Sequence, residues 1–294
     1  MKQGLRAWAE LLRVSALFTV PGDALAGAAS AGLRPNGRTV LAIGSSLCLY
    51  EAGMALNDWA DRAEDAVERP HRPIPSGRVK PAAALVAAVG LTGAGLALAH
   101  RAGRPAGLVA TALAGTVWAY DLRLKHTAAG PAAMAAARSL DLLLGATATG
   151  GTVARPSLLP AAALGAHTYA VTTVSRHETQ GGAVSAPLAA LAGALALGAL
   201  TARPAPSPWT RPAPADLARA ALAATYAATA AKPLFHAVLN PSPPLTQRAV
   251  GGGIKAMIPL QAALAARAGS VRTAAALAGL VPVARTLARK VSPT

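Results

Sequence analysis

Blocks of about 20 apolar residues recur along the whole chain, and they limit the folds that it can adopt. A helix of this length is what a chain needs to cross the hydrocarbon core of a bilayer. We predict nine membrane-spanning helices, or ten if the last block also spans instead of lying in the interface as an amphipathic helix. The blocks are 14–33, 39–56, 81–99, 105–122, 129–150, 157–174, 183–201, 214–234, 249–266 and 271–291.

The composition of the 294 residues agrees with this pattern. Hydrophobic residues make up 53% and charged residues 14%, whereas a soluble domain uses about 25% charged residues. This argues against a soluble enzyme, and the apolar content excludes a disordered chain. The net charge of +16 is spread between the apolar blocks, as in membrane-protein loops, which argues against nucleic-acid binding. We predict an all-α polytopic transmembrane bundle that forms one domain over 1–294.

The N-terminal segment resembles a signal peptide in having Lys2, Arg6 and Arg13 before an apolar run. Pro21 and Asp23 interrupt that run and many similar runs follow, so we predict a first transmembrane helix instead. The lysines and arginines in the loops weakly favour a cytoplasmic N-terminus.

Acidic residues are concentrated in one short segment after the second block. If this segment is helical, Asn57, Asp61 and Asp65 share a face, and the repulsion between carboxylates at that spacing is relieved by a divalent cation. Oxygen ligands of this kind suit Mg²⁺. The alternative is a solvated acidic loop that neighbouring arginines neutralise. Of the 12 acidic residues in the chain, the segment holds Asp58, Asp61, Glu64, Asp65 and Glu68.

The acidic segment continues into a proline-rich loop, Glu68-Arg-Pro-His-Arg-Pro-Ile-Pro-Ser-Gly-Arg78. Three prolines within six residues stiffen it and fix Arg72 and Arg78 beside the acids. Carboxylates that hold a metal and guanidinium groups that bind phosphate would together form a diphosphate site.

The pattern Asn57-Asp58-x-x-Asp61-x-x-x-Asp65, followed by Arg-Pro-Ile-Pro-Ser-Gly at 72–77, resembles the UbiA superfamily of intramembrane prenyltransferases. The residue-level resemblance is strongest over 57–80, in a loop between the second and third predicted spans, where that family has it. The resemblance implies a helical bundle around a central cavity. It also implies a polyprenyl diphosphate donor and Mg²⁺ held by Asn57, Asp58, Asp61 and Asp65.

Two further elements are similar to family features. Tyr120-Asp-Leu-Arg-Leu-Lys125 resembles a tyrosine–lysine element after the fourth span, although a basic loop that anchors a helix end is an equal alternative. Arg138 and Asp141 lie within the fifth span, where ionisable residues are functional or neutralise each other. The resemblance implies catalytic roles for Asp61, Asp65, Arg138 and Asp141. It implies diphosphate binding by Arg72, Arg78, Tyr120, Lys125 and Arg176.

The loop after the sixth span departs from the family pattern, which has a second Asp-x-x-x-Asp motif there. This chain has Val174-Ser-Arg-His-Glu-Thr-Gln-Gly-Gly182, and Glu178 is the only acid between Asp141 and Asp216. The loop resembles a diverged branch, the EboC-type proteins of bacterial ebo gene clusters. Either Glu178, with help from His177 or Gln180, holds a second metal ion, or Arg176 replaces its charge, or prenyl transfer is lost.

The function implied by the resemblance is a Mg²⁺-dependent transfer of a polyprenyl group from an allylic diphosphate to an unidentified acceptor. The location implied is the cytoplasmic membrane of a bacterial-type cell, with membrane lipid as surroundings and no obligate protein partner. The alternatives are a multi-pass transporter or lipid-handling protein that has lost transferase chemistry, and a non-catalytic scaffold. A CDP-alcohol phosphotransferase is disfavoured because Asp61-Arg-Ala-Glu lacks that family's Asp-Gly-x-x-Ala-Arg pattern.

Overall fold

The computed structural model describes residues 2–13, 17, 19–203 and 214–291, and it is all-α over these residues. A π-helical turn, η2 (Tyr120–Leu124), follows α6, and a 3₁₀ turn, η3 (Arg155–Ser157), precedes α8. The α-helices are α1 (Lys2–Leu11), α2 (Val20–Ser30), α3 (Gly37–Ala60), α4 (Arg62–Glu68), α5 (Pro81–Ala102), α6 (Arg104–Ala119), α7 (Gly130–Gly150), α8 (Leu158–Ser175), α9 (Ser185–Ala202), α10 (Pro214–Leu239), α11 (Pro243–Arg267) and α12 (Val271–Val291).

The all-α prediction is confirmed, but the predicted number of helices is wrong. Each predicted block overlaps one helix, and α1 and α4 are additional. These two helices have only 10 and 7 residues and carry several charged side chains, so a search for long apolar blocks passes over them. In the first predicted block, 14–33, the structure has the 11-residue α2, and residues 14–16 and 18 lie outside the described part.

Four of the described helices are both long and apolar enough to cross a membrane: α3, α5, α9 and α11. The other described helices are shorter or less apolar. Helix α2, for example, is about 16 Å long, roughly half the thickness of a bilayer core. It begins at Val20, with Pro21 in its first turn, and it ends at Ser30, two residues before Gly32, which has a φ of +73°.

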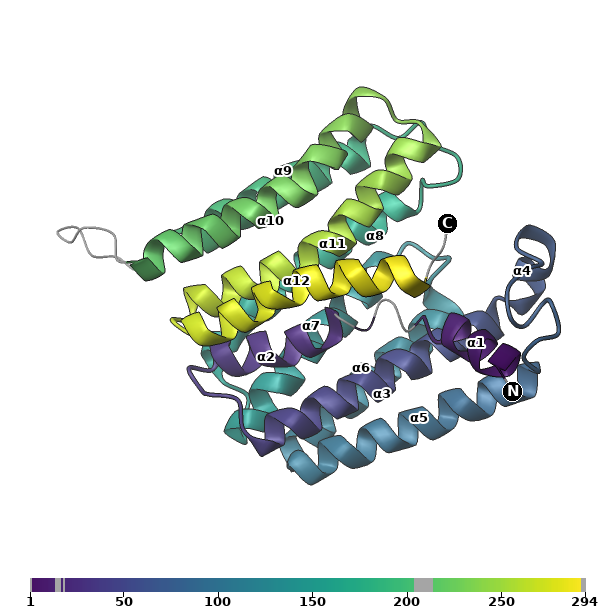
Figure 1. The fold of residues 1–294 in the computed structure, drawn as a ribbon, viewed down its shortest axis with the longest axis horizontal. Helices are drawn as coiled ribbons and strands as arrows, with labels where there is room; N and C mark the ends of the chain where they lie inside the picture. Colours follow the sequence, from purple (N-terminus) through teal and green to yellow (C-terminus); the bar gives the residue numbers. More distant parts are fainter. Residues whose placement is uncertain (1, 14–16, 18, 204–213, 292–294) are drawn as a thin grey trace.

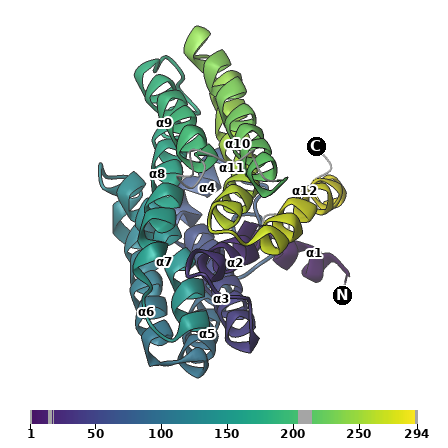
Figure 2. The same ribbon diagram turned by 90° about the vertical axis from the view of Figure 1, so that its left-hand side faces the viewer.

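Helix α2 lies in the middle of the bundle, enclosed by α3, α7 and α11 (Figure 2). Its contact with α7 depends on two glycines. A Cβ at Gly27 would lie 2.1 Å from the backbone oxygen of Leu142, and a Cβ at Gly145 would lie 2.3 Å from the Cα of Ala24. Close approach of helices through small residues is typical of packing in lipid, where van der Waals contact drives association.

One end of the bundle holds the acidic segment and the loops that lie next to it. Helices α1 and α4 lie at this end, on the right of Figure 1. Arg176, just after α8, donates a hydrogen bond to the backbone oxygen of Thr127, just before α7. The backbone N–H of Gly182 donates to the oxygen of Pro241, before α11, at 2.7 Å. The acidic segment, the 120–130 turn and the 176–182 loop therefore share one end of the fold.

We expect Gly145→Ala to destabilise the protein by about 1–3 kcal/mol, because the new methyl group would overlap the backbone of α2. Gly90→Ala in α5 is the matched control, since its Cβ would meet nothing within 4 Å. Thermal unfolding in detergent, followed by the loss of monodisperse protein, measures the difference. Equal midpoints for the two variants would contradict the close α2–α7 contact.

Candidate functional site

The acidic motif lies where α3 ends and α4 begins. Asp61 joins the two helices: its N–H donates to the oxygen of Asn57 at 2.9 Å, and its own oxygen accepts from the N–H of Asp65 at 2.8 Å. The near-continuous helical course keeps Asn57, Asp61 and Asp65 about one turn apart, as their spacing predicts. Asp58 and Asp65 are buried, and Asp61 is partly exposed.

The proline-rich loop folds into a tight turn that fixes Arg72. The hydroxyl of Ser76 donates to the backbone oxygen of Arg72 at 2.7 Å, and Gly77 takes a positive φ of +75°. Ile74 and Val79 are buried in an apolar cluster formed with side chains of α1, α3 and α5. The Pro-Ile-Pro-Ser-Gly sequence therefore supplies both the turn and the apolar anchors that position the arginine.

Cations from two segments neutralise the buried carboxylates. Arg72 lies 2.7 Å from Asp65 and 3.5 Å from Asp58, and Arg13 lies 3.3 Å from Asp58. Arg69 reaches Asp65 less closely, at 3.9 Å. Neutralisation by arginine, the alternative drawn from the sequence, is therefore present in this structure. The neutralising guanidinium groups are also of the kind that binds phosphate.

The Tyr120–Lys125 element is distant from the acidic segment in sequence, but it contacts the same residues in the structure. Lys125 forms an ion pair with Asp61, and the side-chain amide of Asn57 donates to Asp121 at 3.1 Å. Tyr120 lies within electrostatic range of Asp61 and of Arg176.

Asp121 is a buried carboxylate that is not among the site residues predicted from the sequence. Its signal in the sequence was its place inside the Tyr120–Lys125 element. It joins Asp58, Asp61 and Asp65 at the end of α3 only through the fold.

The donor set at this end fits a divalent cation. Asp61, Glu64 and His126 offer ligand atoms that all lie within 4.8 Å of one another. The carboxylates of Asp58 and Asp65 add further oxygen donors at the same helix junction. Hard oxygen ligands are those that Mg²⁺ takes, together with water and phosphate oxygens. His126 is a neighbour that sequence spacing did not reveal.

The 176–182 loop faces the acidic segment from α8. Arg176 is held by the oxygen of Thr127, close to Tyr120. Glu178 is partly buried, and this burial raises its pKa, while the nearby Arg69 opposes the rise. The structure therefore places Glu178 beside the proline-rich loop, within reach of Arg69 rather than in the cluster of Asp61, Glu64 and His126.

Arg78 takes a different position from Arg72. It forms a two-pronged ion pair with Glu10 of α1, at 2.7 and 3.1 Å, and this hydrogen bonding lowers the pKa of Glu10. It also donates to the backbone oxygen of His71. The structure thus uses Arg78 to attach α1 to the loop and does not bring it into the acidic cluster.

Arg138 and Asp141 lie deeper in the bundle. Arg138 donates to Asp23 of α2, and Asp141 accepts from Ser46 of α3. Ser46 is 11 residues before Asn57, which is about 16 Å along α3.

The same network reaches α11. Gln261 donates to Asp23 at 2.6 Å and to the oxygen of Thr19 at 2.9 Å, and Arg138 also contacts the sulfur of Met257 at 2.7 Å. Mutual neutralisation of Arg138 and Asp141, the alternative drawn from the sequence, does not take the form of a direct ion pair, since Arg138 pairs with Asp23. The network joins α2, α3, α7 and α11.

The fold and this site together define a class of protein: an α-helical membrane bundle with a cluster of carboxylates, arginine and lysine at one end. The model of the UbiA prenyltransferase family matches residues 15–227. The chain therefore belongs to the UbiA prenyltransferase family, and it is a multi-pass integral membrane protein.

Curated relatives and solved structures agree with this assignment. The chain is 37% identical over 128 residues to a digeranylgeranylglyceryl phosphate synthase of Methanopyrus kandleri, covering 42% of this chain and 45% of that protein. It is 36% identical over 132 residues to the bacteriochlorophyll synthase 33 kDa chain of Rhodobacter capsulatus, covering 42% of each. These alignments span about half the length of the relatives or less.

A solved UbiA homologue from Aeropyrum pernix K1 superposes with a TM-score of 0.65, over 84% of this chain and 96% of that one. A structure described as a digeranylgeranylglyceryl phosphate synthase in membranes gives a TM-score of 0.62, over 92% of this chain and all of that one. The identities are 16% and 18%, so the two structures support the fold.

We expect Arg72→Gln to loosen the segment 62–79, because Asp58 and Asp65 would be left buried without their shared partner. Hydrogen exchange of backbone amides in that segment should become faster, and added Mg²⁺ should restore protection more strongly than in the unaltered protein. Arg62→Gln is the control, since Arg62 stacks on Trp59 and bonds its backbone oxygen. Unchanged exchange in Arg72→Gln would show that the acids do not need this guanidinium.

Proposed function

We propose that the protein is a Mg²⁺-dependent intramembrane prenyltransferase that moves a polyprenyl group from an allylic diphosphate to an acceptor. The observation that carries this proposal is the convergence of Asn57, Asp61, Asp65, Arg72 and Lys125 at one end of the bundle. Oxygen ligands for a metal and cations for phosphate stand beside one another there. Family membership supports the same chemistry.

Asp61, Asp65, Asp58 and Asn57 would hold the Mg²⁺ ion in this proposal. Bound Mg²⁺ would supply positive charge that stabilises the diphosphate as it leaves. Glu64 and His126 lie close enough to Asp61 to complete the ligand set. Glu178 would act on a second ion only if the 176–182 loop moved it away from Arg69.

The cations exchange partners when the donor binds. In the structure Lys125 pairs with Asp61, and Arg72 pairs with Asp58 and Asp65. With the carboxylates as ligands of a metal ion, Arg72 and Lys125, together with Arg176 and Tyr120, would bind the diphosphate oxygens. The allylic C–O bond then breaks with its electron pair going to pyrophosphate, and the acceptor forms the new C–C or C–O bond and loses a proton.

Arg138 and Asp141 act on another part of the substrate in this proposal. Asp141 bonds Ser46, which is about 16 Å along α3 from Asn57, so these residues would lie beside the prenyl chain rather than the diphosphate. We infer that the Arg138–Asp23 pair, with Gln261, holds α2 in position against α7 and α11. The diphosphate role of Arg78 is replaced by its attachment of α1 through Glu10.

The remaining parts of the proposal rest on the relatives and on the sequence. The matched synthases are named for glyceryl phosphate and bacteriochlorophyll products, so the acceptor class differs among relatives, and this acceptor is unidentified. A single domain over 1–294, a cytoplasmic N-terminus, a bacterial-type membrane and the EboC-type branch are retained as proposals from the sequence.

Release of pyrophosphate tests the function. Purified protein in lipid would be given polyprenyl diphosphates of several lengths, with a membrane extract as the source of acceptor, first with Mg²⁺ and then with EDTA. Mg²⁺-dependent release together with a prenylated product supports the transferase. Binding of the donor without release would favour the alternative, a transporter or lipid-handling protein that has lost the chemistry; the absence of acids other than Glu178 in the 176–182 loop is the observation behind it.

We expect Asp61→Asn to lower pyrophosphate release by about 10²–10³-fold, because it removes a charged ligand at the point where Asn57, Lys125 and Glu64 meet. Glu68→Gln is the matched control, since Glu68 is an exposed acid of the same segment. Both variants should still be found in the membrane and should be monodisperse after purification in detergent. Unaltered turnover in Asp61→Asn would show that Asp61 is not a ligand of a catalytic metal ion.

A further inference from the structure

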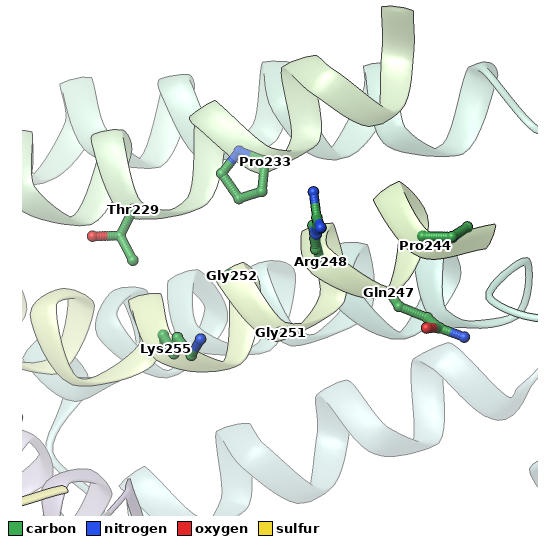
Figure 3. Close-up of a pocket in the computed structure, with 8 residues that line it drawn as sticks. All are labelled: Thr229, Pro233, Pro244, Gln247, Arg248, Gly251, Gly252 and Lys255. Atoms are coloured by element: carbon green, nitrogen blue, oxygen red, sulfur yellow. The ribbon is translucent and has the colours of Figure 1, made fainter. Parts of the chain in front are cut away.

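A hollow of about 590 Å³ lies between α10 and α11, and none of its lining residues belongs to the acidic cluster. Figure 3 shows Arg248 extending from α11 toward α10, with Lys255 further along the same helix. The lining residues are Thr229, Pro233, Pro244, Gln247, Arg248, Gly251, Gly252 and Lys255. The hollow therefore presents two cations and an amide from one helix.

Arg248 and Lys255 have no acidic partner among the described residues. Arg248 and Lys255 are exposed, and over the described residues neither side chain forms an ion pair or hydrogen bond. No acidic residue lines the hollow. Charged side chains on a membrane helix are costly unless they are paired or reach the interface, so two unpaired cations on one face suggest an external anion.

Small residues and prolines create the space. Gly252 lies against Pro233, where a Cβ would be 2.4 Å from the ring, whereas a Cβ at Gly251 would meet nothing within 4 Å. Pro233 lines the hollow with its ring and has no N–H for the backbone ladder of α10. The hollow thus combines two cations with open space between the helices.

The hollow faces away from the interior of the bundle. Residues on the opposite side of α11 are buried: Met257 contacts Arg138, and Gly253 lies against α8. Arg248 stands at the edge of the apolar block 249–266, and Lys255 is about 10 Å further along the axis. A lysine at that depth reaches the head-group level by extending its side chain.

An apolar side chain stands exposed next to Lys255 on the same helix. Ile254 of α11 is 48% exposed. Together the arrangement offers positive charge at the head-group level and apolar surface next to it. These are the two chemical features of an anionic lipid.

We propose that the α10–α11 hollow is a binding site for the phosphate head group of an anionic membrane lipid, separate from the diphosphate site. Arg248 and Lys255 bind the phosphate oxygens, and Gln247 donates from its side-chain amide. The acyl chains lie along the exposed side chain of Ile254.

Native mass spectrometry of the purified protein in detergent tests the proposal, and it needs no prenyl donor. Phosphatidylglycerol and phosphatidylcholine are titrated separately, and binding of the first lipid is compared. We expect selective binding of phosphatidylglycerol. The Arg248→Gln/Lys255→Gln variant should bind it roughly 30-fold more weakly, because each cation contributes about fivefold at a membrane surface.

Two further variants separate the site from general charge and from packing. Lys232→Gln removes an exposed α10 cation that does not line the hollow, and it should bind phosphatidylglycerol as the unaltered protein does. Gly251→Leu fills the hollow without removing charge, and it should lose selective binding, whereas Gly115→Leu, also at an open position, should keep it.

Three results would overturn the proposal. They are equal binding of the two lipids, equal loss in Lys232→Gln, and unaltered binding in Gly251→Leu. Inorganic phosphate that displaces the lipid at equal concentration would identify a free-phosphate site instead. If the double variant fails to elute as a single species, Lys255→Gln alone and Gly251→Leu decide the question.

Discussion

Mutual repulsion among buried carboxylates is the constraint on which this end of the protein depends. Asp58, Asp65 and Asp121 are buried at or beside the end of α3, where a low dielectric makes like charges costly. The compensating cations come from separate places in the chain. Arg13 follows α1, and Arg72 sits in the proline-rich turn. Lys125 follows η2. The acids therefore hold these segments together, and in the proposed function the same cations would bind the diphosphate.

A second polar network serves the interior of the bundle. Arg138 pairs with Asp23 across the α2–α7 contact, and Gln261 adds α11 to the same group. This pairing requires helices that pack closely, and Gly27 and Gly145 permit that approach. Ion pairs inside a membrane are tolerated when their partners are fixed, so the small-residue packing and the buried charge support each other.

Sequence reasoning worked where the chemistry is local. The spacing of Asn57, Asp61 and Asp65 is a property of a single helix, and the proline-rich turn fixes Arg72 within a few residues of them. It was less complete where partners come from afar. Asp121 and His126 lie about 60 residues from Asp61 and reach it only because η2 packs against the end of α3. Arg78 has the same local context as Arg72, but Glu10 on α1 draws it away.

The sequence by itself determined that the chain is α-helical and membrane-embedded, and it located the acidic motif that we propose binds metal and phosphate. It could do so because bilayer length, apolar content and helical spacing are written in consecutive residues. The tertiary structure decided which cation neutralises which acid and that Arg138 pairs with Asp23. It also decided that Arg248 and Lys255 face outward from α11. These depend on helix rotation and crossing, which are set by the summed packing of small side chains that no single segment encodes.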